Sequence, residues 1–130
     1  MYNYPPFFTA LFKNIGVVFK KSLDSKGRSG ILEYWFFTVF NIFVLTISIS
    51  IKLYSFNESS RLFFFIIIYS LIIVLPSISV TLRRFHDIGL GAVYLLVLLI
   101  PFVQWYAVYL LTKKSIPNDN QYGAKPEFLE

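Results

Sequence analysis

The sequence predicts an all-α, multi-pass membrane protein that forms a single domain over residues 1–130. Hydrophobic residues make up 56% of the chain and charged residues only 15%, whereas soluble domains hold roughly 45–50% and 25%. A soluble domain of this size could not bury so much apolar surface, so the bilayer is the expected solvent. The apolar residues also form three long uncharged runs. We therefore expect three transmembrane helices, preceded by an amphipathic helix at the membrane interface.

The charge balance predicts a membrane surface, and not nucleic acid, as the partner. The formal net charge is +5, and no basic patch with stacking aromatic residues stands apart from the apolar runs, so nucleic acid is not an expected partner. Basic residues beside membrane-length runs indicate the lipid bilayer and its anionic headgroups as partners. The chain has no cysteine, which excludes thiol catalysis, disulfides and cysteine metal sites. A homo-oligomer and another membrane protein stay open as further partners.

The first element is an amphipathic helix over residues 7–23. Its apolar residues recur at helical spacing, and they are Phe8, Leu11, Phe12, Ile15, Val18, Phe19 and Leu23. The opposite face carries Thr9, Lys13, Gly16, Lys20 and Asp24. Such a helix can lie among the headgroups with its apolar face in the bilayer. The alternative is that it packs against the cytoplasmic end of the protein's own helices.

The first membrane span is expected over residues 34–54. Tyr34 and Trp35 stand at its start, where an aromatic belt meets the headgroups, and Lys52 can extend to the interface at its far end. Asn41 is a polar residue inside the span. Its ordinary role is an interhelical hydrogen bond, typically worth about 1 kcal/mol. The alternative role is to line a pore.

The second span covers residues 62–82 and is uncharged throughout. Pro76 lies near its end and predicts a kink, because proline removes one backbone hydrogen bond. Ser77 and Ser79 are placed to satisfy the backbone groups that are freed.

The third span, residues 88–112, is also uncharged and would measure about 37 Å as one helix. Pro101 falls near its middle and predicts a kink there, and Gln104 is the one strongly polar side chain beyond it. In an alternative topology the chain reverses at Pro101 and forms a re-entrant hairpin, although each arm would be too short to cross. Residues 113–130 are expected to form an irregular polar tail.

The distribution of basic residues predicts the orientation in the membrane. With three spans, the side of the N-terminal segment holds Lys13, Lys20, Lys21, Lys26, Arg28, Arg83 and Arg84, and the opposite side holds Lys52, Arg61, Lys113, Lys114 and Lys125. This bias favours a cytoplasmic N-terminus and an external C-terminus. With the re-entrant alternative, all basic residues except Lys52 and Arg61 lie in the cytoplasm.

A group of charged residues beside the apolar runs is the candidate site. It comprises Arg28, Glu33, Arg83, Arg84, His86 and Asp87, four of them in a predicted loop that reads RRFHD. Arginines beside a span set topology, and an acid among them forms an ordinary ion pair. The functional alternative is a headgroup site, because guanidinium groups bind phosphate well. One histidine with two acids is too little for a metal site, and no cofactor is expected. His86 has the chemistry of a general base, but no nucleophile accompanies it, so we assign no catalytic residue.

Three stretches together resemble one known family. They read GRSGILEYWFF, RRFHDIGLGA and NQYGAKP, and their order and spacing match across roughly residues 10–126. The sequence is similar in these stretches to the YhaH-like family of small bacterial inner-membrane proteins, domain of unknown function 805. The matching positions are Gly27, Arg28, Glu33, Tyr34, Trp35, Arg83, Arg84, His86, Asp87, Gly89, Asn120, Tyr122, Gly123 and Pro126. The resemblance implies a multi-pass inner-membrane protein and no established activity. The chain departs from the family pattern at Ile31, where a second arginine is common, and over residues 90–94, where polar residues and tryptophan are usual.

The function expected from these observations is a non-enzymatic structural or regulatory component of the membrane. Two alternatives stay open. The first is a small-solute channel with Asn41 and Gln104 in its lumen. It requires an oligomer, because three helices enclose too little space for a pore. Alternatively, the charged group could bind lipid headgroups or act as a membrane enzyme through His86.

Overall fold

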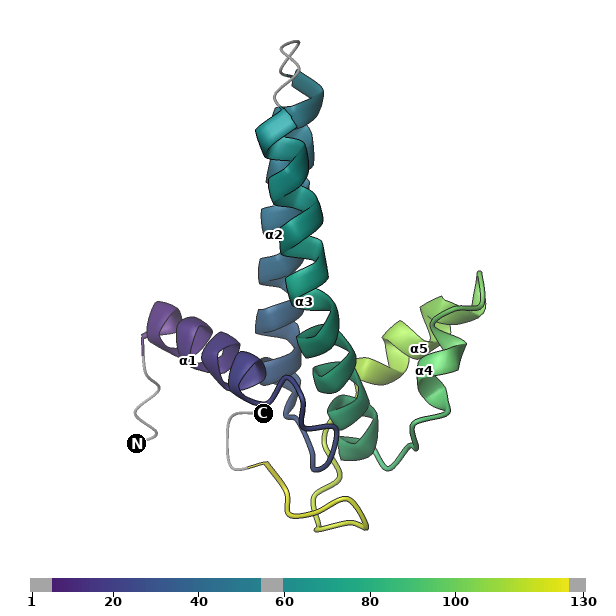
Figure 1. Ribbon diagram of the computed structural model, residues 1–130. Helices are drawn as coiled ribbons and strands as arrows, with labels where there is room; N and C mark the ends of the chain where they lie inside the picture. Colours follow the sequence, from purple (N-terminus) through teal and green to yellow (C-terminus); the bar gives the residue numbers. More distant parts are fainter. Residues whose placement is uncertain (1–5, 55–59, 127–130) are drawn as a thin grey trace.

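The computed structural model describes residues 6–54 and 60–126, and within these ranges the regular structure is helical, apart from one isolated bridge between Asn120 and Gly123. Two long antiparallel helices, α2 (Ile31–Tyr54) and α3 (Ser60–Asp87), form the centre of the molecule (Figure 1). The connection between these two helices, residues 55–59, lies outside the described residues, as do the last four residues of the tail.

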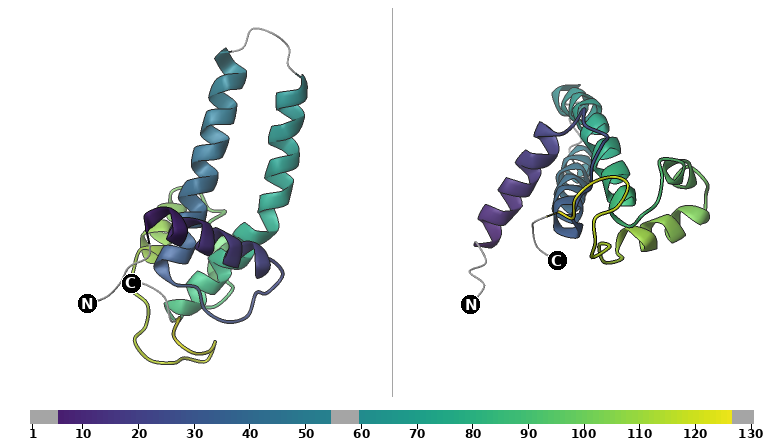
Figure 2. Two further views of the ribbon diagram at one scale, coloured as in Figure 1. Left: turned by 90° about the vertical axis from the view of Figure 1, so that its left-hand side faces the viewer. Right: turned by 90° about the horizontal axis from the view of Figure 1, so that it is seen from below.

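Three short helices surround the lower end of this pair. Helix α1 (Phe7–Lys20) crosses the end of α2 and α3, and α4 (Tyr94–Val97) and α5 (Val103–Leu111) form a hairpin beside α3. Seen from below, α1 and the hairpin extend to opposite sides of the central pair (Figure 2). The irregular segment 112–126 returns beneath α3.

Helix α1 packs against the protein and also exposes apolar side chains. Ala10 and Val18 are buried, and the ring of Phe19 meets Phe37 of α2 edge-on, with centroids 5.8 Å apart. Phe8 and Phe12 are 69% and 64% exposed. These contacts agree with the alternative in which this helix packs against the protein's own helices. Its insertion among headgroups stays a prediction, for which these exposed rings are suitable groups.

Helices α2 and α3 are both long and apolar enough to cross a membrane. Large apolar side chains are exposed along their length, such as Phe43 at 62% and Leu71 at 68%. So much exposed apolar surface is unfavourable in water, whereas in a bilayer it would contact the lipid acyl chains. Asn41 joins the two helices, because the hydroxyl of Tyr69 donates to its Oδ1 over 2.6 Å. This is the interhelical role expected of Asn41 rather than a pore lining.

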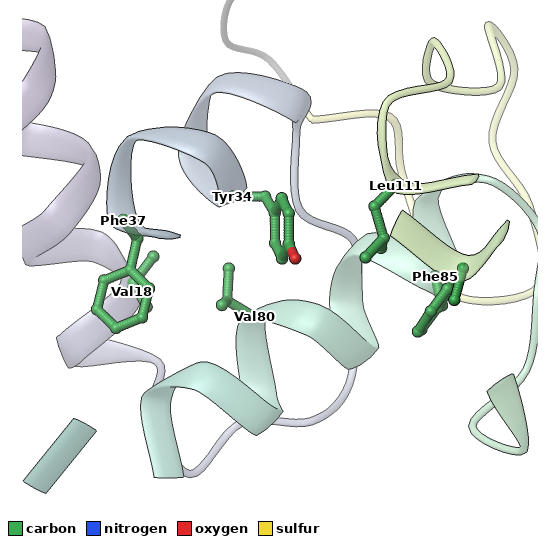
Figure 3. Packing of buried hydrophobic residues seen from close by; sticks show 7 residues of the cluster. Val18, Tyr34, Phe37, Val80, Phe85 and Leu111 are labelled. Atoms are coloured by element: carbon green, nitrogen blue, oxygen red, sulfur yellow. The ribbon is translucent and has the colours of Figure 1, made fainter. Parts of the chain in front are cut away.

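The core lies at the lower end, where the helices converge. Figure 3 shows its side chains, which come from α1, α2, α3 and α5. They are Val18, Tyr34, Phe37, Val80, Phe85, Ala107 and Leu111. Tyr34 is only 8% exposed, and its ring meets partly buried Trp35 edge-on at 5.3 Å. Tyr34 therefore belongs to the core and not to the aromatic belt that we expected at the headgroups.

The expectation of a loop at RRFHD is wrong, because these residues form the last turns of α3. The helix ends just after Asp87 in a Schellman motif, in which the backbone N–H groups of Gly89 and Leu90 donate to the carbonyls of His86 and Phe85 over 3.1 and 2.8 Å. Gly89 has a φ of 80°, a left-handed conformation that glycine adopts without steric penalty. Basic side chains suit this position, since they complement the negative end of the helix dipole.

The expectation of one kinked helix over residues 88–112 is also wrong. The segment forms α4 and α5, and the chain reverses between them (Figure 1). Pro101 has no N–H to continue a helix, and Phe102 adopts a φ of 66° at the reversal. The chain before and after this segment meets, because the Ile116 N–H donates to the Asp87 carbonyl over 3.2 Å. In the described part of the chain, two helices rather than three have the length and composition of a membrane span.

Candidate functional site

Three of the predicted site residues meet in a buried ion-pair network at the end of α3. The carboxylate of Asp87 accepts from Nε of Arg28 over 2.9 Å and from Nη1 of Arg84 in the same helix. The Ser115 hydroxyl donates to the same carboxylate oxygen as Arg84. The side chains of Arg28, Arg84 and Asp87 are fully buried. We call Arg28, Arg84, Asp87 and Ser115 the Asp87 network.

The remaining donors of the two arginines bind backbone carbonyls, most of them in the segment after α5. Arg28 donates to the carbonyls of Ile116 and Asn118 over 2.7 and 2.8 Å. Arg84 donates to the carbonyl of Leu111 over 3.1 Å and to that of Lys113. These acceptors lie far from Arg28 and Arg84 in the sequence. The Asp87 network therefore fastens the loop before α2, the end of α3 and the C-terminal segment together.

Arg83 forms a separate ion pair on the side of α3 that faces the start of α2. Its Nη1 donates to Glu33 Oε1 over 2.8 Å, and the two side chains are 1% and 13% exposed. Glu33 lies in the first turn of α2, where a negative charge is favourable. The Nε and Nη2 atoms of Arg83 are buried and have no hydrogen-bond partner among the described residues. The hydroxyl of Ser29 is a third buried atom of this kind.

His86 is held between the loop before α2 and the C-terminal segment. Its Nδ1 lies 3.2 Å from the carbonyl oxygen of Gly27, so this nitrogen carries the proton that the carbonyl accepts. Its ring stacks on that of Tyr122, with centroids 3.9 Å apart and an interplanar angle of 1°. The side chain of Asn120 also donates to the His86 carbonyl over 2.8 Å. The contacts of His86 thus support the position of the C-terminal segment.

The two predicted intramembrane polar residues do not come together. Asn41 is buried between α2 and α3, and its amide also donates to the Phe37 carbonyl over 2.7 Å. Gln104 is exposed on α5, and no hydrogen bond joins it to Asn41 in the described ranges.

Sequence reasoning missed the contribution of the C-terminal segment. Asn120 and Tyr122 were part of the family resemblance, but no residue pattern indicated that they contact His86. Ser115 carried no signal, because a serine after a polar Lys-Lys pair is ordinary tail composition. The signal that was present is the NQYG turn, in which the Tyr122 N–H donates to Asn120 Oδ1 over 2.9 Å.

The exposed apolar helices and the buried charged end together define an α-helical membrane protein. The family model of a protein family of unknown function, DUF805, matches residues 22–124, and the chain belongs to this family. It is 29% identical over 112 residues to the inner membrane protein YhaH of Escherichia coli strain K12, covering 85% of this chain and 93% of that protein. It is 30% identical over 112 residues to the inner membrane protein YhaI of the same strain, covering 85% and 92%. No solved structure matches the chain.

Proposed function

We propose that this protein is a non-enzymatic structural or regulatory component of the bacterial inner membrane. The observation that carries the proposal is the Asp87 network. Its charged side chains are fully buried, and their donors and acceptors are directed to one another and to the backbone. Groups used in this way hold the fold and are not available to a substrate.

The surroundings of His86 support the same conclusion. A general base needs a ring nitrogen within reach of a substrate proton. Here the residue is 7% exposed, one face of the ring is covered by Tyr122, and Nδ1 is directed at the Gly27 carbonyl. These contacts suit a residue that fixes the C-terminal segment.

A stability measurement on His86 tests the role. Replacing a catalytic residue commonly leaves stability unchanged or raised, because active sites are not optimised for stability. We expect His86→Ala instead to lower the free energy of unfolding by about 1–2 kcal/mol, through loss of the aromatic stack and one hydrogen bond. The measurement is thermal unfolding of the purified protein in mild detergent.

Two variants of Tyr122 provide matched controls. Tyr122→Phe keeps the stack on His86 and is expected to unfold close to the wild-type temperature. Tyr122→Ala removes the stack and should unfold early, as His86→Ala does. A His86→Ala protein as stable as the wild type would contradict the structural role and favour the enzyme alternative.

We also propose a topology with α2 and α3 as the two spans and with α4 and α5 as a re-entrant hairpin. The hairpin takes the place of the third span that was expected over residues 88–112. The contact of Ile116 with Asp87 supports it, because the segment between them begins and ends at the same place. The two external basic residues would be Lys52 and Arg61, and the other ten would lie in the cytoplasm. This is a much stronger inside bias than three spans give.

A further inference from the structure

The guanidinium of Arg83 has a free edge that suits an anion. Nη1 is paired with Glu33, and Nε and Nη2, both buried, have no hydrogen-bond partner within residues 6–54 and 60–126. These two nitrogens lie on the same edge of the planar group, so their N–H bonds form a parallel fork. Such a fork matches two oxygens of one phosphate or carboxylate. A buried donor without a partner is unfavourable, so an anion that accepts from this edge would be stabilised there.

A second buried polar group without a hydrogen-bond partner among the described residues belongs to Ser29, whose backbone is hydrogen-bonded to that of Arg83. Ser29 is fully buried, and its backbone N–H donates to the Arg83 carbonyl over 3.1 Å. Its hydroxyl, like the fork, has no partner in the described ranges. A hydroxyl can donate one hydrogen bond to an anionic oxygen. Because the two backbones are adjacent, Ser29 is a candidate second donor to an anion at Arg83.

The net charge of the buried side chains around Arg83 also favours the binding of one anion. Five charged side chains are buried or nearly buried at the lower end of α2 and α3, namely Arg28, Glu33, Arg83, Arg84 and Asp87. Three of these five described side chains are positive and two are negative, so the group carries a net charge of +1. An uncompensated buried charge is strongly unfavourable. A monoanion would neutralise it, and the unoccupied fork is on Arg83.

We propose that Arg83 binds a phosphate group, with Ser29 as a second donor. Among these five side chains Glu33, the partner of Arg83, is the most exposed, at 13%. The phosphate belongs either to the headgroup of an anionic phospholipid or to a free phosphate ion. The proposal goes beyond the structural role and uses different donors from those of the Asp87 network, so either can fail without the other.

Lipid retention by the purified full-length protein tests the site. Native mass spectrometry in mild detergent would compare phosphatidylglycerol, diacylglycerol and inorganic phosphate as added probes. Diacylglycerol has the acyl chains but no phosphate. We expect phosphatidylglycerol to bind in preference to diacylglycerol. We expect Arg83→Lys, which keeps the charge but removes the fork, to weaken that binding about tenfold. Arg61→Lys, at the other end of α3, is the matched control and should bind as the wild type.

A second variant keeps the test decisive if Arg83→Lys does not fold, which thermal unfolding would reveal. Ser29→Ala leaves the pair of Arg83 and Glu33 intact, and we expect it to weaken phosphate binding about threefold, through loss of one hydrogen bond. Preference for phosphatidylglycerol identifies the lipid as the source. Binding of inorganic phosphate that is sensitive to these variants, without that preference, identifies the free ion. Binding of both probes that is unchanged in every folded variant would overturn the proposal.

Discussion

Asp87 is the residue on which the lower end of the protein depends most directly. Both oxygens of its carboxylate accept hydrogen bonds from buried groups, and two of these groups are guanidiniums that cannot lose their charge. A buried carboxylate paired in this way adds little net stability compared with an apolar residue, but removing it leaves its partners uncompensated. The arginines also hold the C-terminal segment, so the loss would spread beyond the site.

The substitution Asp87→Asn measures this dependence. We expect it to lower the free energy of unfolding by roughly 3–5 kcal/mol, because two buried positive charges lose their counter-ion. Chemical unfolding in detergent micelles would measure the change.

The matched control for this substitution is Asp119→Asn, at an exposed position where the side-chain oxygen accepts from the Lys125 N–H over 3.0 Å. Asparagine keeps such an acceptor, so the effect there should stay within about 0.5 kcal/mol. Equal effects at the two positions would show that the network is not a structural anchor.

Helix α3 is the element that brings the site together, and its end is fixed by Gly89. The left-handed residue turns the chain sharply, which lets the segment after α5 return under the helix. A Cβ atom at this position would lie 2.8 Å from Cδ1 of Ile116, and the backbone conformation disfavours any other residue. The same residue thus ends the helix and leaves room for the returning segment.

We expect Gly89→Ala to lower the free energy of unfolding by at least about 1–2 kcal/mol, the penalty of a left-handed non-glycine residue. Thermal unfolding in detergent measures it. Gly16 is the control, because it lies within α1 and an added Cβ would meet nothing within 4 Å. Gly16→Ala should therefore stabilise the protein, by up to about 1 kcal/mol. A stabilising effect of Gly89→Ala would show that α3 does not need glycine in the left-handed conformation at its end.

At the scale of the whole molecule, the topology separates one long hairpin from a compact base. The α2–α3 pair extends away from the base, whereas α1, the α4–α5 hairpin and residues 112–126 all lie at one end of it (Figure 1). On the proposed topology, Lys26 and Lys114 lie at this end of the molecule, on the cytoplasmic side. Their positions relative to the membrane can be read with single cysteines, since the chain has none of its own.

Cysteine labelling tests this topology in intact bacterial cells with a membrane-impermeant maleimide. We expect Tyr54→Cys, at an 89% exposed position, to be labelled without opening the cells. Lys26→Cys and Lys114→Cys, both at exposed positions, should react only after the cells are opened. Labelling of Lys114→Cys in intact cells would instead place the C-terminal segment outside, as three spans require. Labelling of all variants in opened cells controls for reactivity.

The sequence by itself determined the helical class, the membrane as solvent and two of the long helices. These follow from composition and from the length of uncharged runs, which are local properties of the chain. The grouping of Arg28, Arg84 and Asp87 was anticipated from their charges at the edge of such runs. The spacing of motifs along the chain also identified the family.

Only the tertiary structure decided how these parts are used. A proline in an uncharged run is compatible with a kink and with a reversal, and the outcome depends on whether both ends of the run are held together. Here they are held by Arg28 and Arg84, whose acceptors include the backbone carbonyls of Ile116 and Lys113 in the segment after α5. Every residue except proline offers the same backbone groups, so no residue pattern identifies such acceptors in advance. The choice of partners for each arginine, including the free edge of Arg83, was therefore fixed by the fold alone.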